Sequence, residues 1–361
     1  MKYSALQTQL FKLPGKGLAL AATGALLLSG FVCIGGGETA GRFPAYIPYD
    51  SSQNEIAEGV AVDKVGNVYV SIGGMSGPRG EIYKYTPSGE KSVLIDFGTP
   101  GVVGLAVDAI GNVYVTRMVP PHNGVYRVDP QGNAVRLPGT EKIVFPNALA
   151  FDSEGNLFVT ETFSFDPPLR QYPGLAIPYG LGGIWCIPKK GDAELWLRHE
   201  LLSGTGLFAS LFPFPVGANG IAFYHGALYV ATTERGIILR IPVSPAGAPA
   251  AEPVVAAVVP DPDPRFAMFG PPTPDGLALD VHGNFVVPVI NRHAVVRISA
   301  DGSTWETLAT ANDGLVAPPS VAFGTGKGER TSLFVTSMGF PVFGGPSLIK
   351  IETGIPGLPL P

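Results

Sequence analysis

The chain has 361 residues, of which 45% are hydrophobic, so it is long enough to bury a sizeable core. Its net charge of −5 and the lack of any long basic run exclude the usual nucleic-acid-binding face, so we expect no nucleic-acid partner. The 48 Gly and 36 Pro lie mainly between apolar stretches, which indicates many turns. Helical periodicity is not sustained after residue 40, so we predict an all-β fold.

The first 40 residues differ from the rest of the chain. Three lysines precede an apolar stretch over residues 18–34, which ends in a run of small residues. This pattern is typical of a secretory signal peptide, although the stretch is almost long enough for an uncleaved anchor. We expect residues 1–40 to be a signal peptide or N-terminal anchor. The protein is then predicted to be secreted or periplasmic, and to contact a membrane only through this segment if at all.

A short motif returns six times along the remaining chain. Each copy is an apolar strand, a polar Gly-containing turn and a second strand, as in EGVAVDKVGNVYV. The spacings between copies are 45, 44, 72, 56 and 44 residues. A period in the forties built from short strands is typical of a β-propeller blade, so six copies predict six blades. The copies begin at Glu58, Val103, Asn147, Asn219, Asp275 and Pro319.

Blades one to five each contain four predicted strands, as in GVAVD, NVYVSI, EIYKYT and KSVLIDF for blade one. Blade three carries a long insertion between its second and third strands, and blade six contains only three strands. We predict its fourth strand in FPAYIP, residues 43–48, which would close the ring and leave no open sheet edge. Residues 41–355 are therefore predicted to form a six-bladed β-propeller closed by an N-terminal strand in the last blade. Residues 356–361 are predicted to form a C-terminal tail.

The residues that open the six inner strands are expected to converge at one mouth of the central channel. Four of them carry side-chain oxygens, a donor set that suits Ca²⁺, which takes 6–8 oxygen ligands. Zn²⁺ is disfavoured because no His or Cys occupies these positions. The alternative is that Asn and Asp simply favour the turn before a strand, which explains one such residue better than four in register. The predicted ligands of the divalent metal are Glu58, Asn147, Asn219 and Asp275.

Four motifs in this register, AEG at 57–59, PNA at 146–148, ANG at 218–220 and PDG at 274–276, resemble those of one family. This is the senescence-marker-protein/gluconolactonase/luciferin-regenerating-enzyme family of six-bladed propellers, with relatives among the paraoxonases and diisopropylfluorophosphatase. The resemblance covers roughly residues 43–355. It implies a catalytic divalent ion, commonly Ca²⁺, held by the four predicted ligands, which polarises a lactone, ester or phosphoester. It also implies a catalytic role for Glu58 and for Asp275, the latter as base or nucleophile.

Two positions depart from the sugar-lactonase branch of that family. The branch carries an Arg two residues before the third-blade Asn and an Asp directly after it. Here these positions are Phe145 and Ala148. The departure argues against gluconolactone itself as the substrate.

Three apolar insertions are expected on the metal-side face: residues 163–183, 199–218 and 258–274. Long apolar loops over one site favour a lid or a pocket wall, and the alternative is that they pack against each other. For the two histidines among the candidates, the alternative is solvent exposure without function. The substrate-binding candidates at this face are Arg117, His122, Glu161, Glu234, His293, Phe163, Phe212 and Phe269.

These observations favour a secreted, calcium-dependent hydrolase that acts on a small, fairly apolar lactone or ester. One alternative is a non-enzymatic binding propeller of the NHL-like type, in which the metal is structural. Another is a lyase or synthase on the same scaffold. The fold alone does not separate these functions.

Overall fold

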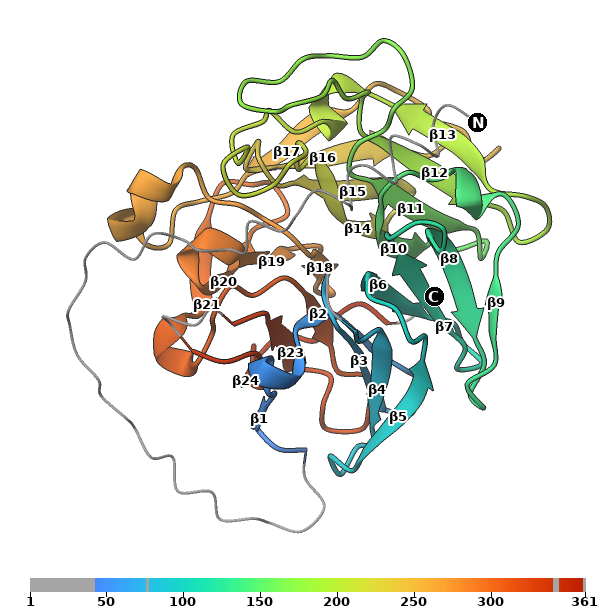
Figure 1. The fold of residues 1–361 in the computed structure, drawn as a ribbon. Helices are drawn as coiled ribbons and strands as arrows, with labels where there is room; N and C mark the ends of the chain where they lie inside the picture. The colour runs from blue at the N-terminus through green and yellow to red at the C-terminus, as the bar shows by residue number, and fades with distance from the viewer. Residues whose placement is uncertain (1–42, 76–77, 340–343, 360–361) are drawn as a thin grey trace.

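The computed structural model describes residues 43–75, 78–339 and 344–359. Its regular structure is almost entirely strand, in six antiparallel sheets of four strands each. The sheets are arranged around a common centre, with the first strand of each blade innermost (Figure 1). The prediction of an all-β, six-bladed propeller is confirmed.

The strands follow one another from the axis outwards in chain order. Blade one contains β2 (Ala57–Val62), β3 (Val68–Ile72), β4 (Glu81–Tyr85) and β5 (Lys91–Asp96); blade two contains β6 (Val102–Val107), β7 (Val113–Arg117), β8 (Gly124–Val128) and β9 (Ala134–Arg136). Blade three contains β10 (Pro146–Phe151), β11 (Leu157–Glu161), β12 (Gly183–Ile187) and β13 (Glu194–Arg198); blade four contains β14 (Ala218–Tyr224), β15 (Ala227–Thr232), β16 (Ile237–Pro242) and β17 (Val254–Val258). Blade five contains β18 (Ala278–Leu279), β19 (Phe285–Val289), β20 (Ala294–Ile298) and β21 (Trp305–Ala309); blade six contains β22 (Val321–Phe323), β23 (Ser332–Ser337), β24 (Ser347–Glu352) and β1 (Tyr46–Pro48).

Short 3₁₀ helices are confined to the connections between strands. Within the described ranges they are η1 (Ser51–Gln53), η2 (Thr140–Lys142), η3 (Glu200–Leu202), η4 (Pro264–Phe269), η5 (Ile290–Arg292) and η6 (Ala311–Asp313). None of the helices in the described part of the chain is long and apolar enough to cross a membrane. The predicted signal peptide or anchor, residues 1–40, lies outside the described residues.

The hairpin turns between the first and second strands are built by a repeated aspartate. In blade one the Asp63 carboxylate accepts hydrogen bonds from the backbone amides of Val65 (3.0 Å) and Asn67 (2.8 Å) and from the Asn67 side chain (2.7 Å). Gly66 supplies the positive φ of +91° that the turn requires. The same arrangement recurs in blades two, three and five, where these turns shape the face opposite the inner-strand openings. The corresponding aspartates are Asp108, Asp152 and Asp280.

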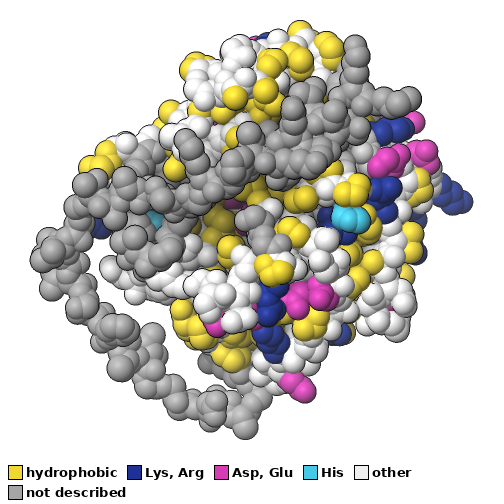
Figure 2. Space-filling model, viewed as in Figure 1, with side chains coloured by type: hydrophobic (Ala, Val, Ile, Leu, Met, Phe, Trp, Pro, Cys, Tyr) yellow, Lys and Arg dark blue, Asp and Glu magenta, His cyan; other side chains and the backbone are white. Residues whose placement is uncertain are grey.

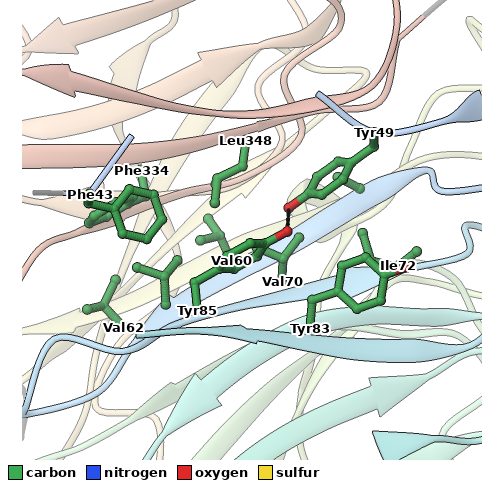
Figure 3. Packing of buried hydrophobic residues seen from close by; sticks show 12 residues of the cluster. Phe43, Tyr49, Val60, Val62, Val70, Ile72, Tyr83, Tyr85, Phe334 and Leu348 are labelled. Carbon is green, nitrogen blue, oxygen red and sulfur yellow. Dashed lines mark hydrogen bonds between the residues drawn. The ribbon is translucent and has the colours of Figure 1, made fainter. Parts of the chain in front are cut away.

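The ring is closed by the N-terminal strand, as predicted. β1 pairs in antiparallel fashion with β24, with Tyr46 opposite Ile349. Residues on either side of β1 are buried against blade one: Phe43 packs edge-on against Tyr85, and the Tyr49 and Tyr85 hydroxyls are hydrogen-bonded at 3.0 Å (Figure 3). The first described residues therefore join blade six to blade one.

The segment predicted as a C-terminal tail pairs with the inner strand of blade five. The backbone amide of Val281 donates to the Pro356 carbonyl (2.9 Å), and the amide of Leu358 donates to the Leu279 carbonyl (3.1 Å). Since β18 has only two residues, these bonds satisfy backbone groups at its end.

Truncation will test the ring closure. Deletion of residues 1–50 removes β1 and the apolar contacts of Phe43 and Tyr49, and it exposes the edge of β24. We expect a large fall in the thermal unfolding midpoint or loss of folding, whereas deletion of residues 1–40 should leave the midpoint unchanged. Equal midpoints for the two truncated proteins in a calorimetric scan would refute this role.

A point substitution will isolate the packing contribution. Phe43 is 5% exposed and its ring centroid lies 4.9 Å from that of Phe334. Phe43→Ala should lower the free energy of unfolding by about 3–5 kcal/mol, because it leaves a cavity in the seam. The matched control is Tyr46→Ala, since Tyr46 is 49% exposed, and its effect should stay within about 0.5 kcal/mol in denaturant titrations. Similar effects of the two substitutions would contradict the assignment of the seam.

Candidate metal centre

The openings of the inner strands meet around one small cavity on the axis. Its volume of about 30 Å³ is enough to hold a water molecule or an ion. The four oxygen-bearing residues predicted as ligands all line it, together with the two apolar positions of the same register. These six residues are Glu58, Val103, Asn147, Asn219, Asp275 and Pro319.

A ring of hydrogen bonds holds these six residues in place. The backbone carbonyl of each accepts a hydrogen bond from the preceding blade. At four seams the donor is a hydroxyl on the second strand, and at two seams it is a backbone amide. The hydroxyl donors are Ser71 to Val103 (2.6 Å), Thr116 to Asn147 (2.6 Å), Thr160 to Asn219 (2.7 Å) and Thr336 to Glu58 (2.6 Å). The amide donors are Gly220 to Asp275 (2.8 Å) and Gly276 to Pro319 (2.8 Å).

The ring of hydrogen bonds explains why glycine occurs in the AEG, ANG and PDG motifs. A Cβ atom on Gly59 would lie 2.2 Å from the Val103 carbonyl oxygen, and one on Gly220 would lie 2.4 Å from the Asp275 carbonyl oxygen. The close approach of neighbouring blades therefore requires glycine at these two positions. Sequence reasoning missed the hydroxyl ring, although the Ser or Thr that ends VYVS, VYVT and LFVT signals it.

The two carboxylates lack a positively charged neighbour in the cavity. Burial raises the pKa of Glu58 to about 7. Burial, and then the nearby charge of Glu58, raises the pKa of Asp275 well above its usual value, against a hydrogen bond from Asn219 that lowers it. No Lys, Arg or His is among the described residues that line the cavity. A divalent cation would neutralise both carboxylates, so the residues present fit such an ion.

The donor set is made of oxygens alone. Among the described residues, no group of three or more His, Cys, Asp or Glu side chains is placed to hold a metal. The axial cavity offers two carboxylates and two carboxamides instead. That set matches the preference of Ca²⁺ and does not supply the nitrogen or sulfur ligands of a zinc site.

Two of the predicted mouth residues are engaged in structural contacts away from the cavity. Arg117 is buried, donates a hydrogen bond to Thr99 and lies over the Phe97 ring, 4.5 Å from its centroid. Glu161 is fully buried and pairs with the Arg198 guanidinium at 2.5 Å. The structure does not bring either side chain to the axis.

Glu234 anchors an insertion. Its buried carboxylate accepts hydrogen bonds from the backbone amides of Thr205, Gly206 and Phe208, so it ties down the segment before β14. Like the other two charged candidates, it does not line the cavity in the described part of the chain.

The two candidate histidines have different surroundings. His122 is exposed, and its pKa is lowered by partial burial and by the charges of Arg117 and Arg136. The side chain of His293 is buried, and its backbone adopts the left-handed conformation with a φ of 50°. Burial lowers the pKa of this imidazole. Its Nδ1 accepts a hydrogen bond from the Ala317 amide at 2.9 Å, two residues before Pro319. Neither imidazole lines the axial cavity.

The aromatic candidates belong to a cluster formed by the insertions. Phe163 is buried and stands 4.9 Å from Phe145 and 5.1 Å from Phe214 between ring centroids. Phe212 is half-buried and packs on the same cluster, which we call the aromatic cluster. Hydrophobic side chains crowd the loops at the top of the view in Figure 2. The side chain of Phe269, the last residue of η4, is outside the described part.

The aromatic cluster reaches the axial cavity at one point. Val103, which lines the axial cavity, also packs in this cluster with Met118 and Phe145. Two of the insertions, 163–183 and 199–218, therefore pack on each other, as the alternative held, and their cluster borders the cavity at Val103 as an apolar wall. The other members are Phe163, Phe165, Tyr172, Leu175, Tyr179 and Phe214.

Comparison with known proteins was made on the sequence and on the fold. Residues 216–339 match the family model described as the SMP-30/Gluconolactonase/LRE-like region, and this span includes Asn219 and Asp275. No curated protein sequence matched the chain significantly.

Several solved structures share the fold over most of their length. Regucalcin from Agrobacterium tumefaciens, described as a calcium-binding protein, has a TM-score of 0.61 at 16% identity, covering 89% of this chain and 97% of that chain. A luciferin-regenerating enzyme has a TM-score of 0.60 at 14% identity, covering 85% and 95%. A gluconolactonase from Xanthomonas campestris has a TM-score of 0.58 at 22% identity, covering 85% and 87%.

The resemblance predicted from the four motifs is thus confirmed by a sequence model over part of the chain and by the fold over most of it. The protein is a six-bladed β-propeller with an SMP-30/gluconolactonase/LRE-like region.

Proposed function

We propose that this protein is a hydrolase of a small, fairly apolar lactone or ester, and that it depends on a divalent cation, with Ca²⁺ preferred. The observation that carries the proposal is the axial cavity, where oxygen side chains from four blades meet without a cationic neighbour. The likeness to a gluconolactonase supports the hydrolase class, and the likeness to a protein described as calcium-binding supports the metal. The proposed ligands are Glu58, Asn147, Asn219 and Asp275.

When bound, the cation would supply Lewis-acid polarisation of the substrate carbonyl and stabilise the developing oxyanion. Asp275 is the proposed base, because its carboxylate is buried at the axis and can take a proton from the attacking water, or attack the carbonyl itself. The Asn219 carboxamide hydrogen-bonds Asp275, which favours the ionised form that either role requires. Glu58 supplies the second negative charge and shares the proposed catalytic role.

In this proposal the reacting carbonyl approaches the cation from the mouth of the axial cavity, where the inner strands open. On the side of blades two and three it would meet Val103 and the aromatic cluster. That wall favours burial of an acyl chain or an aryl group. The proposed substrate-binding roles of Arg117, Glu161 and Glu234 find no support in their buried contacts.

A binding propeller with a structural metal is the second candidate. The observation that favours it is that all three charged mouth candidates are engaged in structural contacts, which leaves few polar groups to orient a substrate. Measured hydrolysis separates the two candidates. A hydrolase turns over an ester or lactone, whereas a binding propeller is only stabilised by the metal.

We further propose that the protein acts outside the cytoplasm, as the pattern of residues 1–40 suggests. Fractionation of cells that express the full chain will test this. Recovery of the protein only in the cytoplasmic fraction would contradict it.

Calorimetric titration of chelator-treated protein will test the metal. We expect one site that binds Ca²⁺ more tightly than Zn²⁺, and we expect Asp275→Ala to abolish binding because it removes half of the carboxylate charge. The matched control is Glu252→Ala, whose side chain is 86% exposed, and its affinity should equal that of the unaltered protein. Unchanged affinity in Asp275→Ala would exclude the proposed ligand set.

The pH dependence of stability gives an independent test. In the metal-free protein burial raises the folded-state pKa of Glu58 to about 7 from its ordinary value of 4.5, so the folded state holds more protons than the unfolded state between these values. The free energy of unfolding should therefore fall as pH rises through this window, and saturating Ca²⁺ should remove the fall. Denaturant titrations from pH 4.5 to 7.5 measure it, with Glu58→Gln as the variant that should flatten the curve. A metal-free curve that rises with pH would contradict the electrostatics of the centre.

Substrate comparison tests the chemistry. Medium-chain acyl lactones or aryl esters should exceed sugar lactones in kcat/KM, because each buried hydroxyl left unpaired against the apolar wall costs about 1–3 kcal/mol. Asp275→Asn and Asn219→Ala should each abolish turnover while circular dichroism shows a folded protein. Efficient hydrolysis of sugar lactones would overturn the proposal that the apolar wall selects apolar substrates. Absence of hydrolysis with every class, together with stabilisation by Ca²⁺, would favour the binding propeller.

A further inference from the structure

A carboxamide ligand has an orientation problem that a carboxylate does not have. Either oxygen of a carboxylate can bind a cation, whereas a carboxamide turned by 180° presents its NH₂ group and repels the ion. Two of the four proposed ligands, Asn147 and Asn219, are carboxamides. Their orientation follows from the hydrogen bonds of their nitrogen atoms.

The side chain of Asn147 is oriented by a threonine that directly follows the second strand of the same blade. The Asn147 Nδ2 donates to the Thr162 Oγ1 at 3.3 Å, and the Thr162 hydroxyl donates to the Ala218 carbonyl at 2.9 Å. Because the single hydroxyl hydrogen is used in the second bond, the oxygen of Thr162 can only accept from Asn147. Thr162 is 1% exposed, so no solvent competes for this bond. The nitrogen of Asn147 therefore points to the blade and its oxygen is left for the cavity.

Asn219 is oriented in the same way in the next blade. Its Nδ2 donates to the Thr233 Oγ1 at 3.1 Å, and Thr233 is buried. The nitrogen of Asn219 therefore also points to a threonine of its own blade, and its oxygen is left for the cavity.

Comparison among the six blades shows that threonine accompanies asparagine. The equivalent position follows from the strand register. The residue two beyond the axial one pairs with the second strand, as Leu149 pairs with Val159 and Ile221 with Val230, and the position lies three residues after that partner. In the four blades that present Glu, Val, Asp or Pro to the axis, this position has no side-chain hydroxyl. The residues there are Gly73, Met118, Ile290 and Met338.

We propose that Thr162 and Thr233 are positioning residues that turn the carboxamide oxygens of Asn147 and Asn219 toward the axial cavity, where they would bind a divalent cation. The inference rests on the proposed function, because it assumes that the cavity holds such an ion. The inference adds two residues that are not among the proposed ligands at the openings of the inner strands.

The test is the Ca²⁺ affinity of the chelator-treated full chain, measured by calorimetry. Thr162→Val and Thr233→Val keep the shape of the side chain and remove the acceptor, and each should weaken binding by about 10–100-fold, the usual effect of losing a partner of a metal ligand. Thr162→Ser and Thr233→Ser restore the hydroxyl and should bind nearly as the unaltered protein does. The matched control is Thr232→Val, because the fully buried Thr232 donates its hydroxyl to the Ile237 carbonyl. This variant should bind Ca²⁺ nearly as the unaltered protein does.

A double substitution separates orientation from general destabilisation. In an Asn147→Asp background the ligand no longer has a wrong orientation, so Thr162→Val should change the affinity far less than it does beside Asn147. Unaltered affinity in both valine variants would overturn the inference and leave the metal site intact, as would serine variants that bind as weakly as the valine variants. Absence of Ca²⁺ binding to the unaltered protein would overturn this inference and the proposed function together.

Discussion

Hydrogen bonds to the six axial carbonyls are the constraint on which the rest of the structure depends. The backbone oxygen of each axial residue faces the preceding blade, which donates to it through a hydroxyl or an amide. The bond fixes the depth of every inner strand relative to its neighbours. Because the next side chain along the strand would collide with that carbonyl, glycine follows most axial residues. The packing of neighbouring blades is thus enough to fix the register of the motifs, whether or not the axial side chains bind a metal.

The same constraint makes a metal centre possible. Side chains at equivalent depth in four blades converge, although they are separated by up to 72 residues between successive copies. The fixed backbone leaves only side-chain rotation to be controlled, and buried threonines beside the two asparagines limit it. The electrostatic cost of two uncompensated carboxylates is visible in their raised pKa values. Fold stability and proposed function therefore oppose each other at the axis until a cation is bound.

The repeats predicted the fold and the axial residues well, and they predicted the mouth poorly. The six-fold register, the closing strand at residues 43–48 and the convergence of Glu58 with Asp275 follow from spacing and strand direction alone. Arg117 and Glu161 were expected in the mouth loops, but each is the last residue of a second strand. Side chains alternate along a strand, however, so each lies in the same row as core valines of that strand and is buried between elements. The spacing of the repeats predicts where a residue lies along its strand. The alternation of side chains along the strand decides which face of the sheet its side chain is on.

The claim that a divalent cation lies on the axis is tested most directly by crystals soaked with Sr²⁺ or a lanthanide, ions that replace Ca²⁺ and scatter anomalously. We expect one strong anomalous peak in the axial cavity, with oxygen ligands at about 2.3–2.6 Å from Glu58, Asn147, Asn219 and Asp275. A map without a peak on the axis, or with its main peak coordinated by other residues, would contradict the account.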